Sequence, residues 1–397
     1  MALSFLGKYK TSFFRVLLFA VLLSPIWMVL LWWLTPKRKL VIAIVDKTVL
    51  NSKAQEHISL DWILTHEKFV KNNNELYKKG VDYYGFFPGE NESFKIRGLE
   101  RFSTKQLALL SKDVDVAYFT DTYGIFKNEW YKQGEAKERS GTVYGGMSIQ
   151  DVDFLKQVKA NHKLIITEFN CLGSPTATPI RNEFEKTFGL QWTGWTGRYF
   201  DSFDTTVNKE LPHWLINNYK IRHNGQWPFT KSGIAFVHSD DRIVILEKDT
   251  HLLKELPYIY SSEEGQQHYG MPEKIKYAFW FDVIQPDTSY NHVIAQFKIS
   301  ANEAGQEELR KNSIPVSFPA VTAHVNKDYH FFYFSADFCD NPVELGSSYF
   351  KGINHLRWFM YNTGDPQERK SFFWELYQPL VTTILNDYYY SLKNGPQ

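Results

Sequence analysis

A long run without charge near the N-terminus constrains this chain more than any other feature. Residues 16–36 contain no charged side chain and are mostly Val, Leu, Phe and Trp. An α-helix rises about 1.5 Å per residue, so a run of this length can cross the roughly 30 Å hydrocarbon core of a bilayer. Trp32 and Trp33 fall where an interfacial aromatic belt would lie. The sequence therefore predicts a transmembrane helix within 16–36, with the rest of the chain in water.

The residues around this run indicate how it sits in the membrane. Basic residues flank it on both sides: Lys8, Lys10 and Arg15 before it, and Lys37, Arg38 and Lys39 after it. The small-residue cleavage site of a secretory signal is missing, which favours an uncleaved signal-anchor. We expect residues 1–39 to be a cytoplasmic tail and single-pass membrane anchor, with the globular domain on the extracytoplasmic side.

The composition of the whole chain is that of a globular protein. Hydrophobic residues make up 43 % and charged residues 22 % of the 397 residues. The net charge is +1 and the basic residues are scattered, which argues against a nucleic-acid partner. Cys171 and Cys339 are the two cysteines. One disulfide is compatible with this count, and the redox compartment stays open.

Continuous apolar strands alternate with helices in the first half of the body. Helical segments are expected near 60–70, at 148–160 with Ser148 as N-cap, and at 179–188 before Gly189. The apolar strands cover 40–46, 114–120 and 163–170. Buried strands alternating with helices predict an α/β fold, a mostly parallel sheet with helices on both faces.

The pattern changes beyond about residue 225, where alternating strands predominate. A polar, helix-forming stretch at 301–313 and an amphipathic helix at 371–392 interrupt or follow them. The expected antiparallel strands are 234–237 with 242–247, two strands within 277–300, and the hairpin 316–325 with 329–337. We therefore predict one α/β domain over 40–395 with a β-rich insertion at about 250–315.

Acidic residues stand at the ends of four of the expected strands. They are Asp46, Asp121, Glu168 and Asp337, and the turns that follow add Tyr123, Asn170 and Asp340. Ligands of open α/β sheets bind beyond the carboxyl ends of the strands, so these side chains are candidate ligand-binding residues. Clustered carboxyls can bind a cation, hydrogen-bond sugar hydroxyls, or divide into a general acid and a base. Alternatively, they cap helices or pair with basic residues such as Arg198.

The segment 192–200 is the most distinctive in the chain. Trp195 and Arg198 lie among two Thr-Gly pairs, and these side chains could stack on or hydrogen-bond a sugar-like ligand. The alternative is that the aromatic rings of this segment cover an edge of the sheet.

The turn after the strand 163–170 resembles that of the class I glutamine amidotransferase-like superfamily. The family places its nucleophilic cysteine in a Gly-x-Cys-x-Gly elbow, and this chain has Phe169-Asn170-Cys171-Leu172-Gly173, keeping only the second glycine. His238-Ser239-Asp240 stands in for the family's His-x-Glu pair, so Cys171, His238 and Glu168 are the catalytic candidates that the resemblance implies.

The wider pattern of elements is similar to membrane-tethered members of this superfamily that lack the catalytic residues. The first strand at 41–46 and the closing hairpin through 319–321 and 331–337 carry the likeness. It implies a flavodoxin-like core and leaves the activity open.

Together these features predict a membrane-anchored, extracytoplasmic domain that binds a carbohydrate or a cell-envelope partner. One alternative is a hydrolase that acts on envelope glycans through the strand-end carboxyls or through Cys171, and another is a structural subunit of a membrane assembly. The histidine spacings do not match a zinc helix, and no phosphate-binding loop or dinucleotide fingerprint occurs. We therefore expect no metal and no cofactor.

Overall fold

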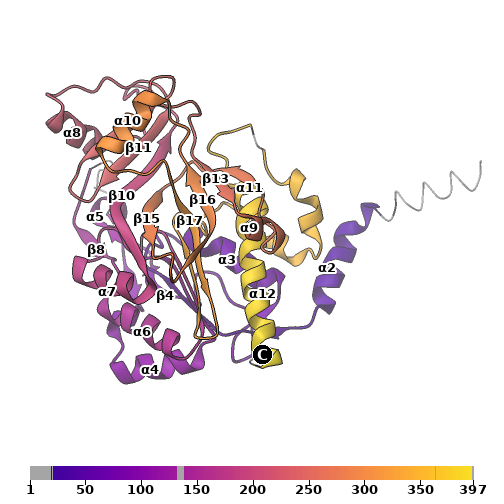
Figure 1. Ribbon diagram of the computed structural model, residues 1–397. Helices are drawn as coiled ribbons and strands as arrows, with labels where there is room; N and C mark the ends of the chain where they lie inside the picture. The colour runs from indigo at the N-terminus through magenta and orange to yellow at the C-terminus, as the bar shows by residue number, and fades with distance from the viewer. Residues whose placement is uncertain (1–18, 20, 132–137, 363, 396–397) are drawn as a thin grey trace, which may run out of the picture.

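The computed structural model describes residues 19, 21–131, 138–362 and 364–395. Within these residues a large mixed sheet runs through the middle of the molecule in the order β14-β13-β16-β17-β18-β9-β6-β2-β4-β5 (Figure 1). Its strands are β2 (Ile42–Asp46), β4 (Tyr84–Pro88), β5 (Phe94–Ile96), β6 (Val116–Asp121), β9 (Leu164–Glu168), β13 (Tyr258–Ser261), β14 (Lys274–Lys276), β16 (His292–Lys298), β17 (Ser317–Val325) and β18 (His330–Phe334).

Parallel strands form the centre of this sheet. β4, β2, β6, β9 and β18 lie side by side and pair in parallel. In chain order this arrangement is 2-1-3-4-5, the flavodoxin-like order. These strands are continuously apolar because both faces of the sheet are covered. The strands expected at 40–46, 114–120 and 163–170 are confirmed, and so is the flavodoxin-like core.

The expectation of a mostly parallel sheet is wrong, because both sides of the parallel centre carry antiparallel strands. β5 pairs with β4, and the series β17, β16, β13 and β14 extends the sheet beyond β18. Short turns join β4 to β5 and β17 to β18, and such turns permit only antiparallel pairing, whereas a parallel pair needs a long crossover. The predicted hairpin at 316–325 and 329–337 is one of these antiparallel pairs.

A smaller antiparallel sheet of order β12-β11-β10-β15 is built from β10 (Leu190–Phe200), β11 (Gly233–His238), β12 (Ile243–Glu247) and β15 (Phe281–Pro286). The predicted strand pair 234–237 and 242–247 is confirmed as β11 and β12. The two strands expected within 277–300 exist, but β15 belongs to this sheet and β16 to the large one. Asn291, between them, donates from Nδ2 to the carbonyls of Phe188 and Gly189, which fixes the chain as it passes from one sheet to the other.

Helices cover both faces of the large sheet, as predicted. Ile42 and Ile44 point to one core and Ala43 and Val45 to the other, following the two-residue period of a strand. The first core contains α3 (Gln55–His66) and α12 (Gln378–Asn394), and the second contains α4 (Thr104–Asp113), α6 (Ile149–Ala160) and α7 (Thr178–Phe188).

Local signals place the ends of several of these helices. Ser148 caps α6 through a reciprocal capping box with Asp151, and α7 ends at Gly189, whose φ of 65° suits a residue without a Cβ. Ser103 forms the same type of box with Gln106 at α4. In contrast, α3 begins at Gln55, whereas the sequence predicted a start near Leu60. The prediction missed the first turn because that turn is polar and carries no apolar stripe.

The remaining short elements lie in connections and at the C-terminus. The described residues include β1 (Arg38–Lys39), β3 (Phe69–Val70), η1 (Leu99–Arg101), β7 (Ile125–Phe126), α5 (Lys127–Trp130), β8 (Thr142–Tyr144), α8 (His213–Arg222), α9 (Glu263–Gln267), α10 (Glu303–Lys311), η2 (Leu345–Tyr349), η3 (Ile353–Phe359), α11 (Lys370–Phe372) and the π-helical turn η4 (Phe373–Tyr377). The helix predicted at 371–392 is present as three consecutive elements, α11, η4 and α12.

The N-terminal apolar run is helical where it is described, as α2 (Ser24–Leu34). Trp32 Nε1 donates to the carbonyl of Thr65 at 3.0 Å, and Lys68 Nζ donates to the carbonyl of Trp33 at 2.8 Å. No residue of α2 is fully buried, and Trp33 is 70 % exposed. Across the described residues, we find no helix with the length and hydropathy needed to span a bilayer. The tail at 1–15 and part of the predicted span, residues 16–18 and 20, lie outside the described residues.

Candidate functional site

Acidic side chains meet along one edge of the large sheet. Asp46, Asp121 and Glu168 end the neighbouring strands β2, β6 and β9, and Asp337 follows the end of β18. Asp46 is in register with Asp121. We call the polar side chains at this edge the rim: Asp46, Thr48, Glu56, Asp121, Tyr123, Asn170, Asp337, Asp340 and Arg369. The structure thus brings together the strand-end acids that the sequence singled out.

A buried carboxyl–imidazole pair forms one side of the rim. Asp46 Oδ2 lies 2.6 Å from His57 Nδ1, and Asp46 Oδ1 accepts from the Thr48 N–H at 2.9 Å. Burial acts to lower the pKa of His57, but the hydrogen bond and charge of Asp46 outweigh it, so the pKa is raised. Burial raises the pKa of Asp61, on the far side of the imidazole, to about 6. The pair holds Asp46 firmly and favours a protonated His57.

The middle of the rim is formed by the turns after β6 and β9. Asp121 Oδ1 accepts from the Tyr123 N–H at 2.6 Å, and Asn170 Nδ2 lies 3.4 Å from Asp121 Oδ2. Asn170 has a φ of 67°, a left-handed conformation that asparagine tolerates well. Burial, and then the charge of Asp46, raise the pKa of Asp121 well above its ordinary value. Tyr123 and Asn170 are half-buried and border the accessible part of the rim.

An arginine closes the other end of the rim. Arg369, just before α11, lies 2.9 Å from Asp340 Oδ2 and 3.5 Å from Asp337 Oδ2. Its guanidinium also lies over the ring of Phe279, 4.0 Å from the centroid. Burial, and then the charge of Asp340, raise the pKa of Asp337 well above its ordinary value. The sequence analysis named Arg198 as a pairing partner for these acids, but in the structure Arg369 takes this place.

Glu56 is a rim residue that the sequence analysis missed. It lies in the first turn of α3, where the helix starts earlier than predicted. Its Oε2 is buried and has no hydrogen-bond partner among the described residues. Burial, followed by the charge of Asp46, raises the pKa of Glu56 to about 8. At neutral pH this carboxyl is therefore largely protonated and can donate a hydrogen bond.

Glu168 is not available to a ligand, although the sequence made it a candidate. It is fully buried, and its Oε1 accepts from the Tyr118 hydroxyl at 2.6 Å. Its Oε2 accepts from the Cys339 N–H at 2.9 Å. Both oxygens are occupied within the core, so Glu168 joins β9 to the segment after β18 and takes no part in an open site.

The catalytic pair suggested by the amidotransferase-like resemblance is not formed. Cys171 is fully buried, and burial, followed by the charge of Asp121, raises the pKa of its thiol well above the ordinary value. His238 ends β11 in the smaller sheet, where Asp240 and Arg242 are its partners. The expectation that Cys171 and His238 lie together came only from analogy with the family's motif. Cys171 and Cys339 are both free thiols, so the disulfide that the count allowed is not formed.

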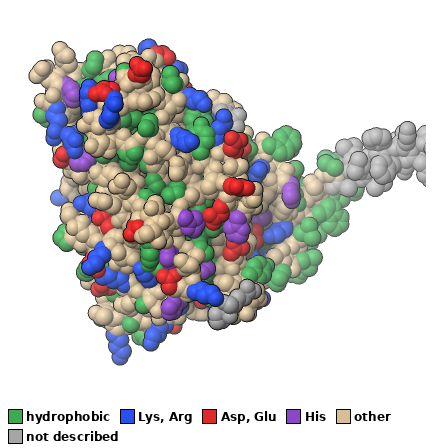
Figure 2. Space-filling view, in the orientation of Figure 1, with side chains coloured by type: hydrophobic (Ala, Val, Ile, Leu, Met, Phe, Trp, Pro, Cys, Tyr) green, Lys and Arg blue, Asp and Glu red, His purple; other side chains and the backbone are tan. Residues whose placement is uncertain are grey.

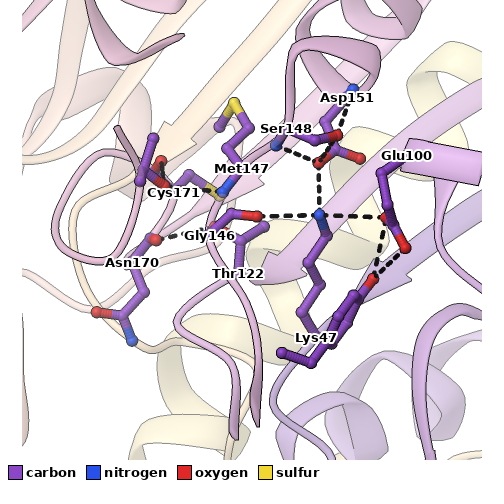
Figure 3. Close-up of polar contacts among 11 residues, drawn as sticks. Lys47, Glu100, Thr122, Gly146, Met147, Ser148, Asp151, Asn170 and Cys171 are labelled. Atoms are coloured by element: carbon purple, nitrogen blue, oxygen red, sulfur yellow. Dashed lines mark hydrogen bonds and ion pairs between the residues drawn. The ribbon is translucent and has the colours of Figure 1, made fainter. Parts of the chain in front are cut away.

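A buried lysine, Lys47, directly follows Asp46 at the end of β2, and Figure 3 shows its side chain among Glu100, Gly146 and Asp151. Lys47 Nζ lies 2.6 Å from Asp151 Oδ2 and donates to the carbonyl of Gly146 at 3.0 Å. Glu100 lies 3.6 Å away from the same nitrogen. Asp151 also accepts from the N–H and hydroxyl of Ser148. This cluster joins the end of β2 to the start of α6.

Trp195 and Arg198, which the sequence made candidate ligand contacts, both lie on strand β10. Trp195 is 2 % exposed, with its ring against His238 and beneath the guanidinium of Arg242. Arg198 pairs with Glu210 at 3.4 Å, and burial lowers its pKa. The alternative that the sequence left open, a segment that covers the sheet, describes Trp195 better.

The described residues contain no group of three or more His, Cys, Asp or Glu side chains arranged to hold a metal ion. The rim presents hydrogen-bonding carboxyls together with Thr48, Tyr123, Asn170 and Arg369. Groups of this kind can bind a polyhydroxylated ligand, or act as an acid and a base where their pKa values differ.

Comparisons with known proteins give only distant structural similarities. No family model matches the sequence, and no curated protein matches it. A ThuA-like protein from Bacteroides uniformis aligns with a TM-score of 0.34 and 12 % identity, over 84 % of this chain and 97 % of that chain. A β-galactosidase from Bacillus circulans sp. alkalophilus aligns with a TM-score of 0.30 and 11 % identity, over 76 % of this chain.

The carbohydrate deacetylase Agd3 aligns with a TM-score of 0.24 and 9 % identity, again over 76 % of this chain. The chain spans only 30 % of the length of the β-galactosidase and 30 % of that of the deacetylase. Similarity at this level defines neither a family nor a function. The strand order of the chain itself defines the fold class: a mixed α/β protein with a flavodoxin-like centre.

Proposed function

We propose that this protein is a membrane-tethered, amidotransferase-like domain without the family's nucleophile chemistry, and that its rim binds a neutral carbohydrate. The observation that carries the proposal is Glu56, whose Oε2 is unpartnered among the described residues and lies at the edge where ligands of parallel sheets bind. Glu56 as a whole is half-buried, and a ligand that reaches Oε2 has to displace the groups that cover this atom in the unliganded protein.

The hydrogen-bonding character of the rim suits sugar hydroxyls. A hydroxyl both donates and accepts, so it is best bound where donors and acceptors alternate. A protonated Glu56 donates, whereas Asp340 Oδ1 and Oδ2 accept, from Gln55 and Arg369 in the unliganded protein. The half-buried ring of Tyr123 can pack against the apolar face of a sugar.

Membrane attachment through residues 16–36 is the second part of the proposal. The described part of this run, α2, exposes apolar side chains on most of its surface, including Ile26, Trp27, Leu31 and Leu34. Such a surface is costly in water and favourable in lipid. The uncharged run continues N-terminally from α2. The body then lies on the extracytoplasmic side, where envelope glycans are the available carbohydrate.

Calorimetric titration of the full chain in lipid nanodiscs tests the binding site. Neutral tetrasaccharides of glucose, mannose and N-acetylglucosamine serve as probes at about pH 6. We expect at least one to bind, and Glu56→Ala to weaken it about tenfold, the loss of one good hydrogen bond. Glu263→Ala is the matched control, because Glu263 is an exposed glutamate in the first turn of α9.

The pH dependence of binding provides a sharper criterion. Affinity should fall as the pH rises through about 8, where Glu56 loses its proton. Glu56→Gln, which keeps an N–H donor at every pH, should remove this fall. If no tetrasaccharide binds, or if binding is the same in Glu56→Ala and the parent protein, the rim is not a carbohydrate site.

A hydrolase is the second candidate, and one observation favours it. The rim contains a largely protonated carboxyl, Glu56, close enough to Asp46 for the charge of Asp46 to raise its pKa. An acid and a base in different environments are the requirement for glycoside hydrolysis. In that case the bound tetrasaccharide should release reducing ends, and Glu56→Gln should slow release about 100-fold or more while binding persists. Binding without release between about pH 5 and 9 excludes the hydrolase.

A further inference from the structure

A second group of exposed apolar side chains lies in the 3₁₀ segment η3. Trp358 is 62 % exposed and Phe359 66 % exposed, and Leu356 beside them is also exposed. We call these three residues the aromatic shelf. Large apolar side chains that gather at one surface position usually mark an interaction site, whereas single ones do not.

The aromatic shelf belongs to the same side of the molecule as α2. The Lys351 N–H donates to the carbonyl of Met28 at 3.1 Å, and the rings of Trp32 and Tyr349 meet edge to face at 4.7 Å. The chain that leads into η3 is therefore packed along α2. Figure 1 shows this part of the chain beside α2, and Figure 2 shows hydrophobic side chains along α2 and on the adjacent end of the body.

The position of this contact along α2 indicates how deep the neighbouring segment lies relative to the bilayer. Met28 lies four residues N-terminal to Trp32, well inside the uncharged run. If α2 is in lipid, the segment that touches Met28 is at the bilayer surface or within it. η3 begins two residues after Lys351, so the aromatic shelf follows this contact closely along the chain.

The residues around the shelf fit a lipid headgroup region. Arg357 is exposed between Leu356 and Trp358, and His355 is exposed just before them. Lys37 and Lys39 are exposed shortly after the end of α2. Trp, Phe and Leu next to basic side chains are typical of segments that lie in the interface of an anionic membrane. A water-soluble partner would not account for the continuity with α2.

We propose that the aromatic shelf inserts into the interfacial region of the same bilayer that holds α2, so that the body is attached at two points. This inference rests on the proposed tether and goes beyond it, because a single helix would leave the body free to rotate. The occupant is a bilayer that contains anionic phospholipid. Insertion of the shelf fixes which side of the body faces the membrane.

Lipid-quenching measurements on the full chain test the proposal. Both native thiols are fully buried, so a thiol-reactive fluorophore labels only an introduced cysteine in the folded protein. Three single variants are reconstituted in phosphatidylcholine–phosphatidylglycerol nanodiscs with and without brominated acyl chains: Phe359→Cys on the shelf, Leu30→Cys on α2, and Val207→Cys as the exposed control. Trp358→Cys replaces Phe359→Cys if the latter does not fold.

We expect brominated lipid to reduce the fluorescence of the shelf and α2 labels at least about twofold, and to leave the label at 207 unchanged. Quenching at 30 but not at 359 overturns the shelf proposal and leaves the tether standing. Absence of quenching at both positions overturns the tether as well. If the shelf label is shielded from water but fluoresces equally in nanodiscs with and without brominated lipid, the shelf contacts protein instead of lipid. This result also overturns the proposal.

Discussion

The buried Lys47–Asp151 pair allows a quantitative test of how the rim is held together. The substitution Lys47→Met removes the charge and keeps most of the apolar stem. It leaves Asp151 fully buried without its cation, since Asp151 is 0 % exposed and its Oδ1 already has no partner among the described residues. Removing one member of a buried ion pair typically costs about 3–5 kcal/mol.

The second partner can be removed without losing the shape of the site. In Asp151→Asn the amide oxygen can still accept from the Ser148 N–H, so the cap of α6 is retained. In the double variant neither charge is buried alone, and the remaining cost is the lost hydrogen bond to Gly146 and imperfect packing, about 1–2 kcal/mol. The two single variants should therefore sum to at least about 2 kcal/mol more than the double variant.

Urea unfolding of the four proteins in a mild detergent, followed by tryptophan fluorescence, measures these differences. The free energies of unfolding enter a double-mutant cycle at constant pH and salt. A loss below about 1 kcal/mol for Lys47→Met would contradict the reasoning, because such a value is expected for an exposed ion pair. Additive single variants would show that Lys47 and Asp151 are not coupled.

Three further predictions use the same preparation. Cys171 should react with a thiol reagent only at the rate of unfolding, because its thiol is buried and its pKa is raised; fast labelling at neutral pH would contradict this. Ser103→Ala should lower the unfolding free energy by about 1 kcal/mol through loss of the α4 capping box, whereas no change would show that the box is not formed. The pKa of Glu56 is raised from 4.5 to about 8, so its contribution to stability is complete below pH 4.5 and is lost as the pH rises through 8. Glu56→Gln should therefore reduce the change of the unfolding free energy with pH across this range. An unchanged pH profile would refute the raised pKa of Glu56.

The parallel centre of the fold was predictable because its strands carry an unmistakable pattern. Val41–Val45 and 164–166 are apolar at every position, which is typical of strands in a sheet that is covered on both faces. Local capping chemistry placed α6 and α7 almost to the residue, since Ser148 and Gly189 act within one turn. The addition of antiparallel strands was harder to foresee, because strand partners are set by tertiary contacts that leave no local signal.

The candidate site was predictable in part for the same reason. Strand ends in a parallel sheet share one edge, so Asp46, Asp121 and Asp337 could be placed together from the sequence. Glu168 has the same sequence setting, but its environment is decided by Tyr118, 50 residues away. Glu56 and Arg369 come from a helix start and a loop, and nothing in their neighbours along the chain indicates that they approach the strand ends.

The connection between α2 and β2 has a consequence for where the protein can act. Only residues 35–41 join them, a length that spans about 25 Å when fully extended. Moreover, this stretch is not free to extend, because Arg38 and Lys39 pair with Phe69 and Val70 as a short parallel ladder. If residues 16–36 lie in lipid, as we propose, so short a connection confines the body to the layer directly above the membrane. The distance of a glycan from the membrane, as much as its chemistry, would then decide whether it is recognised.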